Sequence, residues 1–181
     1  MMNTKITTKQ LVQIALVAAI YAALTGLFMT ISFTPLQLRL SEIMVFLAYF
    51  NPLATVGLTL GCFLANLLFS PTPVLDCIFG TLATLLSVGA ISYTAKAFNG
   101  SKKGVWIASI WPVVFNALIV GAMLYFAGFM PPSEHGALVA MISSMISVGF
   151  GECLVVMVMG IPVTLFVMTK YKRAIAQFLQ G

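Results

Sequence analysis

The chain has 181 residues, of which 61% are hydrophobic and only 7% are charged. Together with a mean hydropathy of +1.08, this composition excludes an ordinary soluble domain. The net charge of +5 does not indicate nucleic-acid binding, because the basic residues lie in predicted loops and near the two ends of the chain.

The apolar residues form unbroken runs of about 20 residues, the length that an α-helix needs to cross a bilayer. A membrane β-barrel would alternate polar and apolar residues instead. We therefore predict an all-α integral membrane protein, a single domain (residues 1–181) with six transmembrane helices. The spans are expected at residues 10–31, 40–50, 53–69, 76–95, 104–128 and 140–168.

The first predicted span carries alanines at spacings of three and four residues, which place them on one helical face. These alanines are Ala15, Ala18, Ala19, Ala22 and Ala23. Small side chains let helices approach closely in lipid. Two interpretations remain open: this face packs within the protein, or it docks onto a partner subunit.

The second span begins in the stretch 37–51 (QLRLSEIMVFLAYFN), where Arg39 and Glu42 stand three residues apart in an apolar setting. Placing one ionised side chain within a membrane costs about 2.5–3.5 kcal/mol on insertion scales, so such residues indicate a functional site. The alternative is that the two side chains only neutralise each other, which contributes about 0.2–0.5 kcal/mol on a helix in water.

Two further polar residues belong to the third and fourth spans. The third span follows the turn signal Asn51-Pro52 and carries Asn66, and the fourth begins at Asp76 after a proline-rich loop at residues 70–75. Each has a structural alternative. Asn66 could form a hydrogen bond between helices, and Asp76 could cap the helix N-terminus.

The fifth and sixth spans carry Asn116 and Glu152. Asn116 has the same interhelical alternative as Asn66. Glu152 lies about twelve residues into its span, or roughly 18 Å at 1.5 Å per residue. It follows Gly149 and Gly151 and has no obvious basic partner on its own helix. Among the polar residues of the predicted spans, Glu152 is therefore the one that a purely structural role explains least well.

The basic residues predict the orientation of the spans, because lysine and arginine are enriched in cytoplasmic loops. With six spans and a cytoplasmic N-terminus, eight of the nine basic residues fall on the cytoplasmic side. They are Lys5, Lys9, Lys96, Lys102, Lys103, Lys170, Lys172 and Arg173. The exception is Arg39. This topology places the polar residues of the spans in the outer and middle parts of the membrane, around a pocket that opens to the outside.

Several classes of chemistry are excluded by missing motifs. There is no phosphate-binding G-x-x-x-x-G-K-[ST] loop and no H-E-x-x-H or G-x-S-x-G motif, and the one histidine, His135, falls in a predicted loop. The three cysteines have no metal-ligand spacing. We therefore predict a binding protein without cofactor or metal, and not an enzyme. Carboxylates and amides suit a small, planar or amine-bearing ligand that is rich in N–H donors.

Six blocks of sequence together resemble the QueT family over nearly the whole chain. They are 39–42 (RLSE), 61–68 (GCFLANLL), 76–86 (DCIFGTLATLL), 115–120 (FNALIV), 148–152 (VGFGE) and 160–162 (GIP). The resemblance implies the substrate-binding S component of an energy-coupling factor (ECF) transporter, a multi-pass protein of the bacterial cell membrane with both termini cytoplasmic. Its partners would be a membrane coupling subunit and two ATPase subunits. Its substrate would be a queuosine precursor, chiefly 7-aminomethyl-7-deazaguanine, with queuine as a relative.

On this interpretation Glu152, Asn116 and Glu42 are the first candidates for substrate contacts. Arg39, Asn66 and Asp76 are the second, and the alanine face of the first span would dock on the coupling subunit. Two alternatives remain open. One is an S component for another heterocyclic vitamin or a nucleobase. The other is a small intramembrane enzyme or a structural membrane subunit without a ligand.

Overall fold

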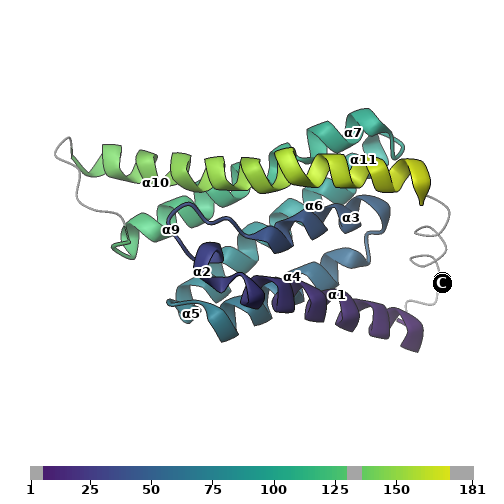
Figure 1. The fold of residues 1–181 in the computed structure, drawn as a ribbon, viewed down its shortest axis with the longest axis horizontal. Coiled ribbons are helices and arrows are strands. Elements are labelled where there is room, and N and C mark those ends of the chain that lie inside the picture. Colours follow the sequence, from purple (N-terminus) through teal and green to yellow (C-terminus); the bar gives the residue numbers. More distant parts are fainter. Residues whose placement is uncertain (1–5, 130–135, 172–181) are drawn as a thin grey trace, which may run out of the picture.

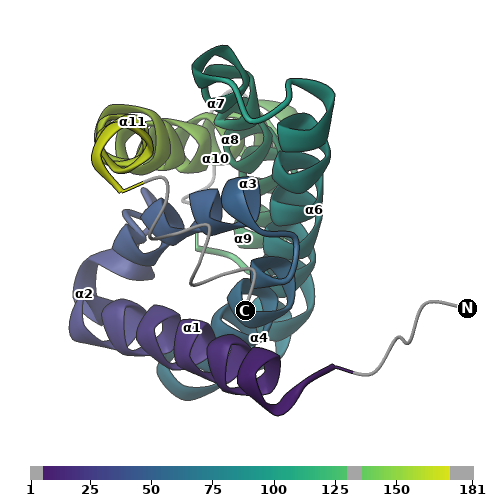
Figure 2. The ribbon, with the colours of Figure 1, turned by 90° about the vertical axis from the view of Figure 1, so that its right-hand side faces the viewer.

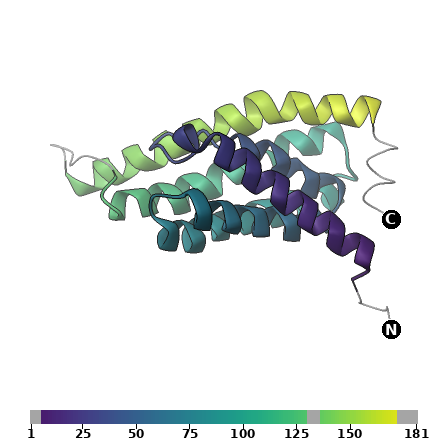
Figure 3. The same ribbon diagram turned by 60° about the horizontal axis from the view of Figure 1, so that its bottom comes forward.

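A computed structural model describes residues 6–129 and 136–171, and in these residues the secondary structure is helical (Figure 1). Lys5, His135, Lys172 and Arg173 lie outside the described residues. The helices run along the long axis of the molecule, except that α1 runs obliquely to α10 and α11 (Figure 3).

The first predicted span is divided in two. Helix α1 (Thr8–Leu27) begins at a capping box, in which Thr7 and Gln10 each accept a hydrogen bond from the other's backbone N–H. It ends at Phe28, and the short helix α2 (Met29–Ser32) follows. The helical path predicted to continue to residue 31 is therefore interrupted at Phe28.

The second span is short and occupies a central position. It consists of the 3₁₀ segment η1 (Leu40–Phe46) and α3 (Leu47–Phe50). Seen along the bundle, α3 lies between α11, α6 and α4 (Figure 2). Because Val45 and Ala48 are fully buried and Phe46 is nearly so, this segment forms part of the protein core.

The remaining segments start and end close to the predicted positions. Helix α4 (Ala54–Phe69) follows a turn at Asn51. A continuous helical stretch then contains α5 (Pro73–Leu75), the π-helical segment η2 (Asp76–Gly80) and α6 (Thr81–Ala97). The next contains α7 (Lys102–Ala108), α8 (Ile110–Phe115), the π-helical η3 (Asn116–Val120) and α9 (Gly121–Phe126). The last contains α10 (Ala137–Glu152), the π-helical η4 (Cys153–Gly160) and α11 (Ile161–Lys170).

Within the described residues, four helical stretches are long and apolar enough to cross a membrane. They are Thr8–Leu27, Pro73–Ala97, Lys102–Phe126 and Ala137–Lys170. Two shorter apolar stretches, Leu40–Phe50 and Ala54–Phe69, accompany them. The prediction of a helical membrane protein is confirmed, whereas the count of six spans and the orientation of the termini stay predictions.

Helix α1 packs closely against α4. A Cβ atom added to Gly61 would lie 2.7 Å from the Tyr21 Cβ and 2.9 Å from the Ala18 carbonyl oxygen. Gly57 and Gly61 are four residues apart, the small-residue spacing that allows close helix contact in lipid. Ala18 and Ala22 are buried on the face of α1 that packs within the protein.

The other alanines of the predicted docking face have a different environment. Ala15, Ala19 and Ala23 are exposed on the opposite side of α1. The structure therefore divides the five alanines between two faces. Packing within the protein accounts for Ala18 and Ala22, and docking onto a partner stays a prediction for the other three.

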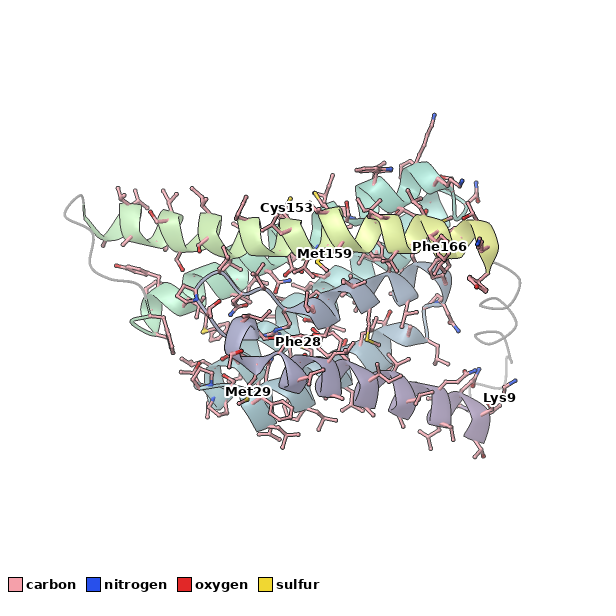
Figure 4. All side chains as sticks on the ribbon, viewed as in Figure 1. Lys9, Phe28, Met29, Cys153, Met159 and Phe166 are labelled. Atoms are coloured by element: carbon pink, nitrogen blue, oxygen red, sulfur yellow. The ribbon has the colours of Figure 1, made fainter. Side chains whose placement is uncertain are left out.

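The exposed basic residues gather at one end of the bundle. Lys9 lies in the first turn of α1, Lys96 in the last turn of α6, Lys102 and Lys103 in the first turn of α7, and Lys170 ends α11. These helix ends lie together (Figure 1), and Figure 4 shows Lys9 at the same end as Phe166 of α11. All five lysines of the described residues are exposed, whereas Arg39 is buried.

Candidate functional site

Four helical segments in the described chain depart from α-helical geometry, and each is associated with a predicted site residue. Glu42 lies in the 3₁₀ segment η1, and the π-helical segments η2 and η3 begin at Asp76 and Asn116. Glu152 ends α10 immediately before the π-helical η4. π-Helical turns within α-helices occur frequently at functional sites, and three of these four segments are π-helical.

Glu42 is held in the interior by hydroxyl groups from two other helices. It is 1% exposed. Its Oε1 accepts a hydrogen bond from the Tyr21 hydroxyl of α1 and lies 3.5 Å from the Thr84 hydroxyl of α6, whose single hydrogen is shared between this oxygen and the Cys62 sulfur. Its Oε2 is buried and has no hydrogen-bond partner. One carboxylate oxygen thus fixes the side chain, and the other accepts no hydrogen bond from the part of the chain that the structure describes.

Arg39 is buried without a direct ion pair to a carboxylate of the described residues. Its Nη1 donates to the Cys62 sulfur at 3.5 Å, and its guanidinium carbon lies 5.2 Å from the centre of the Phe33 ring. Its Nε has no hydrogen-bond partner. Arg39 and Glu42 act on each other electrostatically, but they are not held together by a hydrogen bond. Neutralisation of one charge by the other therefore explains the burial of Arg39 and Glu42 only in part.

Asn66 and Asp76 lie side by side where α4 meets η2. The Asn66 Nδ2 donates to the Asp76 backbone carbonyl at 2.8 Å. This is a hydrogen bond between helices, which is the structural alternative that the sequence left open for Asn66. The Asp76 Oδ2 accepts from the Ser70 hydroxyl and, at 2.8 Å, from the Thr72 hydroxyl. The helix begins at Pro73, so Asp76 does not occupy the N-cap position. The Oδ1 atoms of Asn66 and Asp76 are both buried without a partner.

Glu152 and Asn116 have different surroundings. Glu152 is 3% exposed, and its Oε1 has no hydrogen-bond partner. The charges of Glu42 and Arg39 both act on its carboxylate. The Asn116 Nδ2 donates to the Pro112 carbonyl of its own helix at 3.1 Å, so the bond is not interhelical. Asn116 contributes no unpaired buried atom.

Most of the unpaired buried atoms of the described chain belong to residues of the predicted site. Five of the six predicted residues have such an atom: Arg39 Nε, Glu42 Oε2, Asn66 Oδ1, Asp76 Oδ1 and Glu152 Oε1. Thr81 Oγ1 is also buried without a partner, although Thr81 is not one of the predicted site residues. A buried polar group without a partner costs about 1–3 kcal/mol. Several such groups among residues that interact electrostatically indicate a binding site.

Sequence reasoning missed the residues that hold this site in place. Tyr21 donates to Glu42, and Cys62 accepts from both Arg39 and Asn66. Thr84 contacts both Glu42 and Cys62. Thr84 shares a helical face with Asp76, which was a usable signal. Cys62 likewise shares a helical face with Asn66, whereas Tyr21 gave no signal, because tyrosine is an ordinary residue in an apolar helix.

An apolar groove lies apart from these polar residues. Its volume is about 510 Å³, and it is lined by residues of η2, α6, η3 and α9 that include Phe79, Leu82, Leu118 and Phe126. These side chains are exposed in the isolated chain, so the groove opens toward the lipid. Among the described residues, no group of three histidine, cysteine, aspartate or glutamate side chains is arranged to hold a metal ion.

Comparison with known proteins gives the following matches. The family model described as QueT transporter matches residues 11–169. A curated relative from Lactococcus lactis subsp. cremoris (strain MG1363), named queuosine precursor transporter QueT, is 44% identical over 91 residues. This match covers 48% of the present chain and 52% of the relative, so it spans about half the length of that protein. No solved structure matches the chain significantly.

Proposed function

The chain belongs to the QueT transporter family, and on this premise we propose that it binds a queuosine precursor from the outer side of the cell membrane. The ligand that fits best is 7-aminomethyl-7-deazaguanine, with queuine as a relative. In this proposal the chain is the substrate-binding S component of an ECF transporter and has no catalytic activity of its own. The family name and the apolar helices make it a multi-pass membrane transport protein.

The choice of ligand rests on one observation, namely which of the unpaired buried atoms are hydrogen-bond acceptors and which are donors. The atoms of Glu42, Asn66, Asp76 and Glu152 are acceptors, whereas Arg39 Nε is a donor. An excess of acceptors requires a ligand that brings several N–H groups. A guanine-type ring edge supplies adjacent N–H donors, and its carbonyl oxygen can accept from Arg39 or from the Asn116 amide.

The charges of the site support a cationic substituent on this ring. Three carboxyl groups, from Glu42, Asp76 and Glu152, are buried in the described chain together with one guanidinium group, from Arg39. Buried charges are stable only when they are paired and hydrogen-bonded. An aminomethyl group carries a positive charge at neutral pH and would offset one carboxylate. Asp76 is the candidate for this contact, because its Oδ1 is free while its Oδ2 is bound by Ser70 and Thr72.

The proposal predicts that 7-aminomethyl-7-deazaguanine raises the melting temperature of the purified protein. A ligand that binds only the folded state stabilises it by RT ln(1 + [L]/Kd), which is about 4.1 kcal/mol at 1,000 times Kd. Guanine, which lacks the cationic substituent, should have a smaller effect, and adenine should have the smallest. Unchanged melting curves with all deazaguanines and purines would refute the proposal. A larger shift with another nucleobase would assign the site to that ligand instead.

The partner in this proposal docks on the exposed face of α1. Ala15, Ala19 and Ala23 recur every four residues on the outside of the helix, and large apolar side chains such as Leu16 and Ile20 flank them. This surface is suited to close contact with a helix of a membrane coupling subunit. Ala18 and Ala22 are buried within the protein and cannot take part directly.

Ala19→Trp tests the docking surface. The bulky side chain should prevent close helix contact, so that uptake and co-purification of the coupling subunit and ATPases are lost. Ligand-induced stabilisation should stay unchanged, because Ala19 faces away from the site. Leu85→Trp, on the exposed side of α6, is the matched control and should retain both properties. If Ala19→Trp retains ligand binding and uptake, this face is not a docking surface.

A further inference from the structure

Three side-chain donors converge on one buried sulfur atom, that of Cys62. Thr84 Oγ1 lies 3.2 Å from the sulfur, Asn66 Nδ2 lies 3.4 Å from it, and Arg39 Nη1 lies 3.5 Å from it. The Cys62 thiol faces the Gly80 carbonyl oxygen at 3.7 Å. Cys62 is completely buried, so water cannot replace any of these contacts.

The three donors belong to separate parts of the fold. Arg39 precedes η1, Asn66 lies one turn after Cys62 on α4, and Thr84 lies on α6. Thr84 also reaches Glu42 at 3.5 Å, and Asn66 also donates to the Asp76 carbonyl at 2.8 Å. Cys62 therefore connects the part of the site around Glu42 to the part around Asp76.

In two of these three donor residues, another polar atom of the same side-chain group has no hydrogen-bond partner. Arg39 uses Nη1 for the sulfur while its Nε has no partner, and Asn66 uses Nδ2 while its Oδ1 has none. Arg39 has no ion pair with a carboxylate in the described part of the chain, so the sulfur is the acceptor that the structure provides for it. A guanidinium group and an amide group are rigid and planar, so fixing one nitrogen limits where the rest of the group can lie.

We infer that Cys62 is a positioning residue of the substrate site. Its sulfur holds Arg39 and Asn66 in the orientation that presents Arg39 Nε and Asn66 Oδ1 to the ligand. Cys62 itself does not touch the ligand. This inference rests on the proposed function, because it concerns the same site.

Two substitutions separate the acceptor role of Cys62 from its packing role. Cys62→Val removes the acceptor and adds one carbon atom to the side chain, whereas Cys62→Ser keeps an acceptor in a smaller side chain. We expect Cys62→Val to weaken binding of 7-aminomethyl-7-deazaguanine about tenfold, the effect of losing a hydrogen bond of about 1.4 kcal/mol. Cys62→Ser should retain most of the affinity. Cys77→Val is the control, because Cys77 is only partly buried and its thiol donates to the Phe63 backbone carbonyl.

A double-mutant cycle with Asn66→Ala tests whether Cys62 affects ligand binding through Asn66. The loss of affinity caused by Cys62→Val should be clearly smaller when Asn66 is already alanine, because one of the two positioned groups is then absent. Additive effects, equal losses in the valine and serine variants, or full affinity in Cys62→Val would overturn the inference. Should Cys62→Val not fold, Cys62→Ala also removes the acceptor and takes its place. If the parent protein does not bind the ligand, the proposed function fails first, and this inference falls with it.

Discussion

Glu152→Gln is expected to lower ligand affinity about 10- to 100-fold and, at the same time, to raise the melting temperature of the ligand-free protein. The loss of affinity follows because a hydrogen bond to a charged acceptor contributes about 1.5–3 kcal/mol. The gain in stability follows because Glu152 Oε1 is buried without a partner, and an amide is less costly to bury than a carboxylate. Melting curves with and without 7-aminomethyl-7-deazaguanine measure both effects on one sample.

The opposite signs of these two effects distinguish a binding residue from a structural one. Thr164→Val is a matched control on the same continuous helix, since Thr164 is also buried but donates to the Gly160 carbonyl of its own helix at 2.8 Å. It should leave ligand affinity unchanged. If Glu152→Gln lowers the melting temperature without ligand, the carboxylate has a stabilising partner in the protein. If the Glu152→Gln variant binds the ligand as tightly as the parent protein does, Glu152 does not contact the ligand.

Gly151→Ala is expected to cause the second large effect, by displacing the chain segment that leads to Arg39. A Cβ atom at Gly151 would lie 1.7 Å from the Leu36 carbonyl oxygen, so the backbone of one of the two segments must move. The nearby hydrogen bond from the Ser147 hydroxyl to the Pro35 carbonyl, at 3.1 Å, would be strained as well. Overpacking of this kind typically costs about 1–3 kcal/mol. We expect a lower melting temperature and weaker ligand binding together.

Gly89→Ala provides the control for this substitution. Gly89 lies within α6, and an added Cβ atom would meet no atom within 4 Å. Alanine is favoured over glycine in a helix by about 1 kcal/mol, so Gly89→Ala should bind ligand normally and melt at the same or a higher temperature. Parent-like affinity in Gly151→Ala would show that the segment around Leu36 does not position Arg39 and η1.

The positions of the helices could be predicted well from the sequence. The predicted span at 53–69 corresponds to α4 (Ala54–Phe69), and that at 76–95 corresponds to Pro73–Ala97. Lipid offers no hydrogen-bond partners to the backbone, so long apolar stretches must form helices. The interruption at Phe28 was not predicted, because the residues on both sides of it are apolar.

The candidate site could be predicted only as a set of residue types. Arg39, Glu42 and Glu152 stand out because charged side chains are costly in a membrane. The hydrogen bonds from Tyr21 to Glu42 and from Arg39 to Cys62 join residues more than 20 positions apart. Neither tyrosine nor cysteine is unusual in an apolar helix, so no local signal revealed these pairs. The role of the site in binding a ligand stays a prediction.

The sequence by itself determined that this protein is a helical membrane protein, where its helices lie along the chain, and which polar residues require explanation. Only the tertiary structure decided which side of each helix faces inward. In α1 it buried Ala18 and Ala22 and left Ala15, Ala19 and Ala23 exposed. The reason is that lipid is as apolar as the protein core, so inward and outward faces carry the same kinds of residue. Close packing against Gly57 and Gly61 selects one face, and buried hydrogen bonds such as that from Tyr21 to Glu42 maintain that choice.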